Sequence, residues 1–264
     1  MYSAIYSITI FFLFFASTLF SSSPFAGLYS TAHFLPLHHT EYQTDIRLAH
    51  GYKTGFYSNW MINSRWRYGL THRLTGSVGF NLSQIHKSGI PGHQTTSVFK
   101  FNGLSSEIRY QIKNPFLDGF GLAFTCGGSF SGDAIVTEQR LIADLNRKRT
   151  IASINVIGNQ FGYFMTDPNN YYSQYMINLG LSRSLTHTIM AGIESQTRYI
   201  FSGDLYDDYA YQTHVLGPVI HIKGSQWWLT SSFLFNLDTS SSFQPDYLPL
   251  QSRYELRILI GRLL

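Results

Sequence analysis

The feature that most constrains this sequence is a strict alternation of apolar and polar residues that recurs along most of the chain after residue 40. In residues 59–70, one side of the alternation consists of Trp60, Ile62, Trp66, Tyr68 and Leu70. Side chains point alternately to the two faces of a β-strand, so a period of two predicts strands with one apolar and one polar face. The same period recurs in residues 104–112, 175–185, 189–199 and 253–260, and helical spacing fits none of these windows.

The alternation predicts an all-β chain of about twelve strands. We expect them at residues 41–50, 56–70, 75–86, 103–112, 119–127, 134–145, 150–164, 173–184, 188–201, 210–222, 226–237 and 252–264. Short connections (71–74, 113–118, 146–149, 185–187 and 223–225) then alternate with longer ones (87–102, 128–133, 165–172, 202–209 and 238–251). Only 51–55 is short where a long connection is expected. This arrangement is typical of an up-and-down antiparallel transmembrane β-barrel of the bacterial outer membrane.

Composition agrees with a chain that has one face in lipid. Only 13% of the 264 residues are charged, while 16% are aromatic, which excludes a disordered chain. Hydrocarbon offers no hydrogen-bond partners, so a chain without long apolar segments can span it only as a closed barrel. A secreted soluble β-sandwich binding protein is the alternative, because its strands also alternate. The polar face favours the barrel, since it is rich in Ser, Asn, Gln, Gly and Arg and poor in Lys.

The first 40 residues contain no Lys, Arg, Asp or Glu. Within them, the apolar run Ile5–Phe20 is followed by the small-residue segment Ser21–Gly27. This order predicts a cleaved secretory signal peptide over residues 1–26, with an uncleaved anchor as the alternative. A short linker (27–40) and an outer-membrane β-barrel (41–264) follow. We therefore expect export to the cell outer membrane.

Two segments carry a resemblance to a known family. They are NWMINSRWRYGLTHRL at residues 59–74 and NGLSSEIRYQIKNP with DGFGLA at residues 102–123. In these segments the chain resembles an uncharacterised family of Gram-negative outer-membrane β-barrel proteins, a domain of unknown function. The resemblance implies a location and an architecture, and it implies no catalytic residues. The chain departs from such barrels at its end, because Leu264 stands where they often have an aromatic residue.

No sequence motif indicates catalysis, a cofactor or a metal. The segment Gly127–Gly132 lacks the spacing of a hydrolase elbow, and we interpret it as a flexible loop or strand-end bulge. His38 and His39 are expected in a polar linker, and His72 and His187 in two similar turns. The carboxylates of residues 203–209 could suit Ca²⁺, but a solvated or lipopolysaccharide-facing loop is favoured. The lone Cys126 excludes a disulfide framework.

The polar face of the strands forms the candidate site. Its charged residues by parity are Asp45, Arg47, Arg65, Arg67, Glu107, Arg109, Glu194, Arg198, Arg253, Glu255 and Arg257. These are seven arginines against four acids. Two interpretations stay open, an ion-pair network that fills the lumen and braces the wall, or a narrow and mildly anion-preferring pore.

The sequence therefore predicts a narrow passive pore, or a structural or surface protein, with an Arg-rich lumen. The alternative function is an enzyme of the lipase or lipid-modifying type at the barrel rim, for which His86, His214 and nearby serines are the candidates. Expected partners are outer-membrane lipid, lipopolysaccharide, the barrel-assembly machinery and small solutes. Nucleic acid is not expected, because the basic residues that give the net charge of +4 are spread over the strands.

Overall fold

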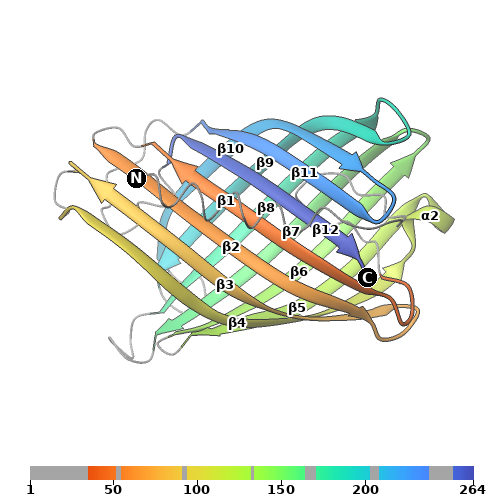
Figure 1. Cartoon of the computed structure of the whole chain (residues 1–264), viewed down its shortest axis with the longest axis horizontal. Coiled ribbons are helices and arrows are strands. Elements are labelled where there is room, and N and C mark those ends of the chain that lie inside the picture. The colour runs from red at the N-terminus through yellow and green to blue at the C-terminus, as the bar shows by residue number, and fades with distance from the viewer. Residues whose placement is uncertain are drawn as a thin grey trace.

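The chain folds into a single β-sheet that closes on itself as a barrel (Figure 1). The computed structural model describes residues 35–51, 55–90, 94–131, 134–163, 171–202, 208–237 and 252–264. Its twelve strands are β1 (Thr40–His50), β2 (Phe56–Gly69), β3 (Leu74–Ser88), β4 (Thr96–Lys113), β5 (Phe120–Ser131), β6 (Ala134–Arg147), β7 (Thr150–Tyr163), β8 (Tyr171–Ser184), β9 (Ile189–Ser202), β10 (Asp208–Lys223), β11 (Trp227–Asn236) and β12 (Tyr254–Leu263). The predicted fold class and strand number are confirmed.

Every strand pairs antiparallel with its neighbour in sequence, and β12 closes the barrel against β1. The closing register runs from Glu41 opposite Leu263 to His50 opposite Tyr254. Closure leaves no unpaired sheet edge and excludes a two-sheet sandwich. The helix α2 (Pro115–Asp118) lies between β4 and β5, and no helix among the described residues is long and apolar enough to cross a membrane.

The two ends of the barrel differ. One end, here called the short-turn end, carries the β2–β3, β4–β5, β6–β7, β8–β9 and β10–β11 connections. The first and last strands also meet there, where the N–H of Leu264 donates to the carbonyl of Thr40 at 2.8 Å. The other end, here called the long-loop end, carries the remaining connections (Figure 1).

Strand β4 begins seven residues earlier than expected, at Thr96 instead of 103. A register shift explains the difference, because Phe80 pairs with Leu104 whereas Leu82 pairs with Phe101. The irregularity contains Gly103, whose φ of 97° is left-handed. A bulge of this kind inserts one extra residue into the strand, so the apolar and polar positions before the bulge are out of phase with those after it. The alternation therefore identified only the part of β4 that follows the bulge.

Strand β5 also runs further than expected, to Ser131. Gly127 pairs with Glu107 on one side and Glu138 on the other, and Gly128 pairs with Ser106 and Thr137. The prediction of a loop or strand-end bulge at Gly127–Gly132 was therefore wrong for residues 127–131. Glycine-rich sequence indicated a loop, but pairing on both sides holds these residues in the sheet.

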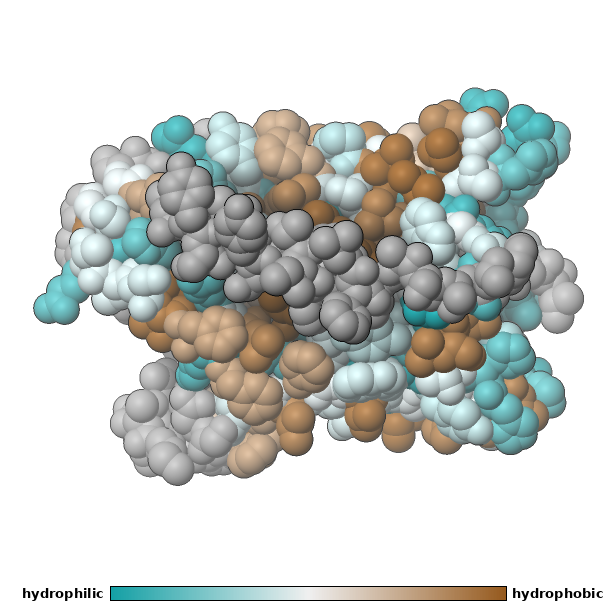
Figure 2. Space-filling model, in the orientation of Figure 1, coloured by the Kyte–Doolittle hydropathy of each residue, from teal (hydrophilic) through white to brown (hydrophobic). Residues whose placement is uncertain are grey.

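The burial pattern is inverted relative to that of a water-soluble protein. On β4, the large apolar side chains of Leu104 and Ile108 are 64% and 55% exposed, whereas Arg109 and Gln111 are 5% and 3% exposed. Apolar side chains cover much of the outer wall in Figure 2. In a closed barrel the exposed face is the outside, so the buried polar face lines the interior. This is the arrangement that a lipid environment requires.

Candidate functional site in the barrel interior

The first ion-pair network of the interior joins three strands. Glu107 on β4 accepts from Arg65 on β2 at 3.4 Å and from Arg109 on its own strand at 3.3 Å. On β6, Arg140 pairs with Glu138. Arg140 also interacts electrostatically with Glu107. Each guanidinium of this network therefore lies close to a carboxylate.

An ion pair on β1 extends this charged belt. The Nε of Arg47 donates to Oδ2 of Asp45 at 2.9 Å, and the Nη2 of Arg47 lies 2.8 Å from the same oxygen. Asp45 also interacts electrostatically with Arg140 on β6, and Arg47 with Glu255 on the neighbouring strand β12. The pair therefore lies between the first network and the charges of β12.

The second ion-pair network joins β8, β9 and β12. Arg198 donates through Nη2 to Oε2 of Glu255 at 2.6 Å, and its Nε contacts Gln196. Arg257 donates through Nη2 to the same Gln196 at 2.8 Å, and its Nε contacts Glu255. Gln196 in turn donates to Asn178 at 2.7 Å. The side chains from β9 and β12 thus meet in the interior, bridging over β10 and β11.

A third group lies in the interior near the short-turn end. Glu41 accepts from Nη1 of Arg67 at 2.7 Å and from the indole Nε1 of Trp228 at 2.7 Å. All three side chains are almost fully buried. One carboxylate therefore ties β1 to β2 on one side and to β11 on the other.

An interior cavity of about 290 Å³ opens beside the first network. Its charged lining consists of Arg47, Arg65, Glu107, Glu138 and Arg140. Uncharged polar side chains line it as well, among them those of Asn63, Ser77, Asn81, Ser105 and Asn159. Phe161 on β7 supplies an aromatic surface and stacks on Tyr172 with ring centroids 4.0 Å apart. The cavity thus offers hydrogen-bond donors and acceptors on several sides of one space.

Most of the residues predicted for the inner face lie in these groups. Glu194 on β9 is 1% exposed. Arg253 differs from the rest, because it precedes β12 and is exposed, and its backbone N–H donates to the carbonyl of Gly51 at 3.1 Å. It therefore lies at the long-loop end, outside the charged belt.

Sequence reasoning missed four charged residues of the inner face, namely Glu41, Glu138, Arg140 and Asp144. Three of them are on β6, where Thr137 and Gln139 are exposed on the outer face. Because β6 has polar residues on both faces, apolar and polar residues do not alternate clearly along it. The charged residues 138, 140 and 144 are separated by even numbers of positions, and this spacing could have indicated that they share one face. With these residues included and Arg253 left out, the predicted and missed charges of the inner face are seven arginines and seven acids; Lys87, Lys223 and Arg262 are half-buried at or next to strand ends.

The histidine pairs noted in the sequence have structural contacts. His38 Nδ1 lies 2.9 Å from the hydroxyl of Tyr68. In the turn of His72, the hydroxyl of Thr71 accepts from the backbone N–H of Leu74, and Thr186 does the same for Ile189 in the turn of His187. No three His, Cys, Asp or Glu side chains gather into a potential metal site in the described part of the chain. Most of the acidic segment 203–209 lies outside the described residues.

A Ser–His contact occurs on the outer wall. His214 on β10 lies 3.5 Å through Nε2 from the hydroxyl of Ser195 and 2.7 Å through Nδ1 from the hydroxyl of Thr197, both on β9. Ser195 and Thr197 alternate with the buried Glu194, Gln196 and Arg198, so they face outward. The Nδ1 of His214 thus faces the hydroxyl of Thr197, whereas in a catalytic triad this nitrogen of the histidine faces a carboxylate.

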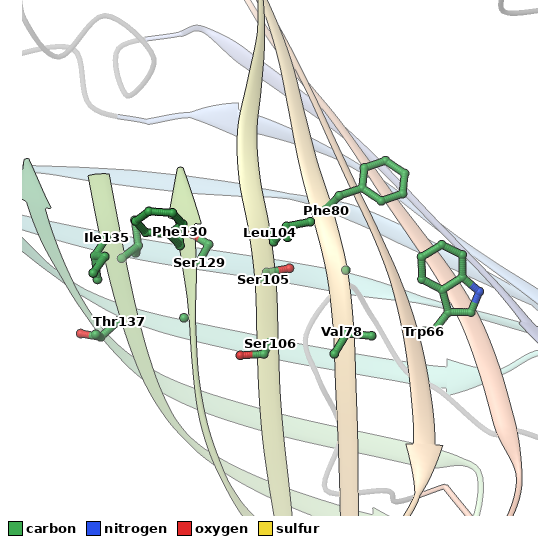
Figure 3. A pocket seen from close by; sticks show the side chains of 13 residues that line it. Trp66, Val78, Phe80, Leu104, Ser105, Ser106, Ser129, Phe130, Ile135 and Thr137 are labelled. Carbon is green, nitrogen blue, oxygen red and sulfur yellow. The ribbon is translucent and has the colours of Figure 1, made fainter. Parts of the chain in front are cut away.

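The outer wall also has an apolar hollow of about 630 Å³. In Figure 3, Trp66 and Phe80 lie on one side of it and Phe130 and Ile135 on the other, with Ser106 between them. None of the residues that line it is titratable, so it holds no acid or base.

Comparisons with known proteins agree with this architecture. A family of unknown function (DUF6662) matches residues 23–140. An outer-membrane channel from Pseudomonas putida F1 is 12% identical, with a TM-score of 0.63 over 88% of this chain and 97% of that chain. The NanC porin is 11% identical, with a TM-score of 0.55 over 84% of this chain and 100% of that chain. The translocator domain of the autotransporter NalP from Neisseria meningitidis is 9% identical, with a TM-score of 0.51 over 87% and 89%.

No curated protein sequence matches the chain. At these identities the likeness establishes the fold alone, which is that of an outer-membrane β-barrel. The expected resemblance to an uncharacterised family of such barrels is confirmed.

Proposed function

We propose that the chain forms a narrow passive pore in the bacterial outer membrane. The observation that carries the proposal is the polar cavity inside the barrel, lined by ion-paired arginines and carboxylates. A twelve-strand barrel is wider than an eight-strand one, whose interior side chains fill, and narrower than an open sixteen-strand porin. The channel from Pseudomonas putida F1 and the NanC porin have the same fold, which supports the proposal.

Reconstitution into planar bilayers tests the pore. We expect discrete conductance steps smaller than those of sixteen-strand porins, because side chains narrow the lumen. Barrel integrity is checked on the same sample by heat-modifiable gel mobility. A correctly folded barrel that is electrically silent and does not let solutes into vesicles would overturn the proposal, and it would leave a structural or surface role.

The proposed pore implies particular surroundings. We expect the apolar outer wall to contact outer-membrane lipid and lipopolysaccharide, and the strands to be inserted by the barrel-assembly machinery after export by residues 1–26. Fractionation of cells that express the full chain, with N-terminal sequencing of the mature protein, tests the location and the cleavage together.

A second candidate function, a hydrolase acting on lipid at the outer wall, is favoured by the contact between His214 and Ser195. A histidine next to a serine hydroxyl can act as the general base of acyl transfer. The geometry favours it less than the pore, because 3.5 Å is at the long limit of a hydrogen bond and Nδ1 contacts a hydroxyl.

Labelling with a serine-directed fluorophosphonate tests the hydrolase. Labelling of the folded barrel that Ser195→Ala abolishes and Ser231→Ala preserves would support it, since Ser231 is also on the outer wall but pairs with Ile220 and Ile258. Equal labelling, or none, would exclude a reactive serine at Ser195.

A further inference from the structure

The charges around the interior cavity are paired. The inner-face set described above has seven arginines and seven acids, and the half-buried Lys87 and Lys223 add positive charge at the two ends of the barrel. Within the cavity lining, Glu107 and Glu138 pair with Arg65 and Arg140, and the third arginine, Arg47, pairs with Asp45, which is not part of the lining. The seven-to-four excess of arginine counted from the sequence thus does not describe the surroundings of the cavity, where each guanidinium has a carboxylate beside it.

We propose that the pore passes small neutral, hydroxylated solutes of about monosaccharide size in preference to ions of either sign. This inference rests on the proposed pore function and specifies its substrate class. It follows from three properties of the cavity, which are the pairing of its charges, its uncharged polar lining and its size.

The pairing of the charges disfavours ions. An ion that enters a narrow cavity gives up part of its hydration and needs an opposite charge in return. Here each carboxylate near the cavity already has a guanidinium beside it, so a bare anion or cation would have to compete with an existing ion pair. The lining itself contains one arginine more than it has glutamates, and Asp45 compensates that arginine, Arg47, from outside the lining. The described charges around the cavity therefore leave no unpaired charge of one sign, which is what sets selectivity in ion pores.

The same lining suits hydroxyl groups. A hydroxyl donates one hydrogen bond and accepts others, so it can bridge a carboxylate and a guanidinium without breaking their pair. Asn63, Asn81 and Asn159 add amide groups that both donate and accept. The Oδ1 of Asn159 is buried and has no hydrogen-bond partner in the protein, which leaves an acceptor available to a solute or to water.

The size and the aromatic side of the cavity limit the solute. A volume of about 290 Å³ is at the lower end of small-molecule sites, which span roughly 300–1,000 Å³. The ring of Phe161 is held by stacking on Tyr172 and gives the C–H face of a sugar ring an apolar surface. A monosaccharide fits this combination better than a small inorganic ion or an oligosaccharide.

Vesicle swelling with three solutes of nearly equal size tests the proposal. The probes are glucose, which is neutral, gluconate, which is anionic, and glucosamine, which is cationic at pH 7. We expect glucose to enter several-fold faster than either ion, and a salt gradient in planar bilayers to give a reversal potential near zero. Entry of gluconate or glucosamine at the rate of glucose or faster would overturn the inference and leave the pore intact. No entry of any probe together with electrical silence would overturn the pore itself.

Two substitutions on β6 provide a matched pair. Arg140→Gln removes a positive charge from the cavity, and Glu138→Gln removes a negative charge two residues away on the same strand. We expect the reversal potential to move toward cation preference in the first variant and toward anion preference in the second. If the two substitutions only loosened the packing, the reversal potential would not shift in opposite directions in the two variants. Unchanged potentials in both folded variants would show that these charges do not line the conducting path.

Discussion

Arg198 on β9 and Glu255 on β12 are joined by a 2.6 Å hydrogen bond although two strands lie between them in the wall. Glu255 also pairs with Arg257, so one carboxylate compensates two buried guanidiniums. The inner residues of the intervening strands include Gly217, which has no side chain, and the small Ser232, which pairs with Arg257 in the wall.

Glu255→Gln is therefore expected to destabilise the barrel strongly. The substitution leaves Arg198 and Arg257 without their shared carboxylate, and breaking a buried ion pair costs about 3–5 kcal/mol. Urea unfolding in lipid vesicles, followed by loss of heat-modifiable mobility, measures the effect. Glu138→Gln is the control, because its ion pair is more exposed and should contribute about 1 kcal/mol or less. Equal destabilisation by the two variants would contradict the central role of Glu255.

Gly103→Ala is expected to destabilise the β4 bulge. A Cβ at this position would lie 1.9 Å from the carbonyl oxygen of Phe130, and the φ of 97° is strained for any other residue. A left-handed conformation alone costs about 1–2 kcal/mol per residue outside glycine. Gly76→Ala is the control, since the nearest atom there is the flexible side chain of Leu70 at 3.1 Å. Differential unfolding in urea separates the two, and a Gly103→Ala barrel as stable as the Gly76→Ala barrel would argue against the bulge.

The sequence predicted the barrel well because the lipid imposes the same rule on every strand. Alternation alone located all twelve strands. It gave wrong bounds for the start of β4 and the end of β5, where a bulge and a glycine-rich segment interrupt the period. The partners of the charges could not be predicted, because Arg65 meets Glu107 and Arg198 meets Glu255 across strands that are distant in sequence. Such contacts depend on the curvature and stagger of the closed wall.

Many of the basic residues of the chain lie at one end of the barrel. In the described residues, the short-turn end carries a group of cations and the exposed acid Asp118. The cations are Arg73, Lys113, Arg147, Lys148, Arg149, Arg183, Lys223 and Arg262. The anion preference was inferred from the inner-face parity count of seven arginines against four acids, which missed three acids and one arginine, namely Glu41, Glu138, Asp144 and Arg140.

Cys126 provides a test of which face of each strand meets lipid. The thiol is exposed on β5 between the inward Thr125 and Gly127, so it faces outward. A spin label attached there should be accessible to oxygen, which dissolves in hydrocarbon, and protected from a water-soluble nickel chelate. In a Cys126→Ser background, a label at Ser129→Cys, which lines the interior cavity, should show the opposite preference. If the two labels were equally accessible to oxygen and to the nickel chelate, both positions would lie in the same environment. That result would contradict a barrel whose outer wall faces lipid and whose interior faces water.

Leu141→Arg tests the depth of the barrel in the bilayer. Leu141 lies near the middle of β6, is 46% exposed on the outer wall and pairs with Phe124 and Val156. An arginine at the bilayer midplane costs about 2–4 kcal/mol, and the cost falls to about 0–1 kcal/mol near the interface. Leu145→Arg is the matched control on the same strand, because Leu145 lies only two residues from the last residue of β6. The free energy of unfolding in vesicles should therefore fall more for Leu141→Arg than for Leu145→Arg. The reverse order would move the hydrocarbon core toward the short-turn end, and equal small effects would mean that this face of β6 is in water.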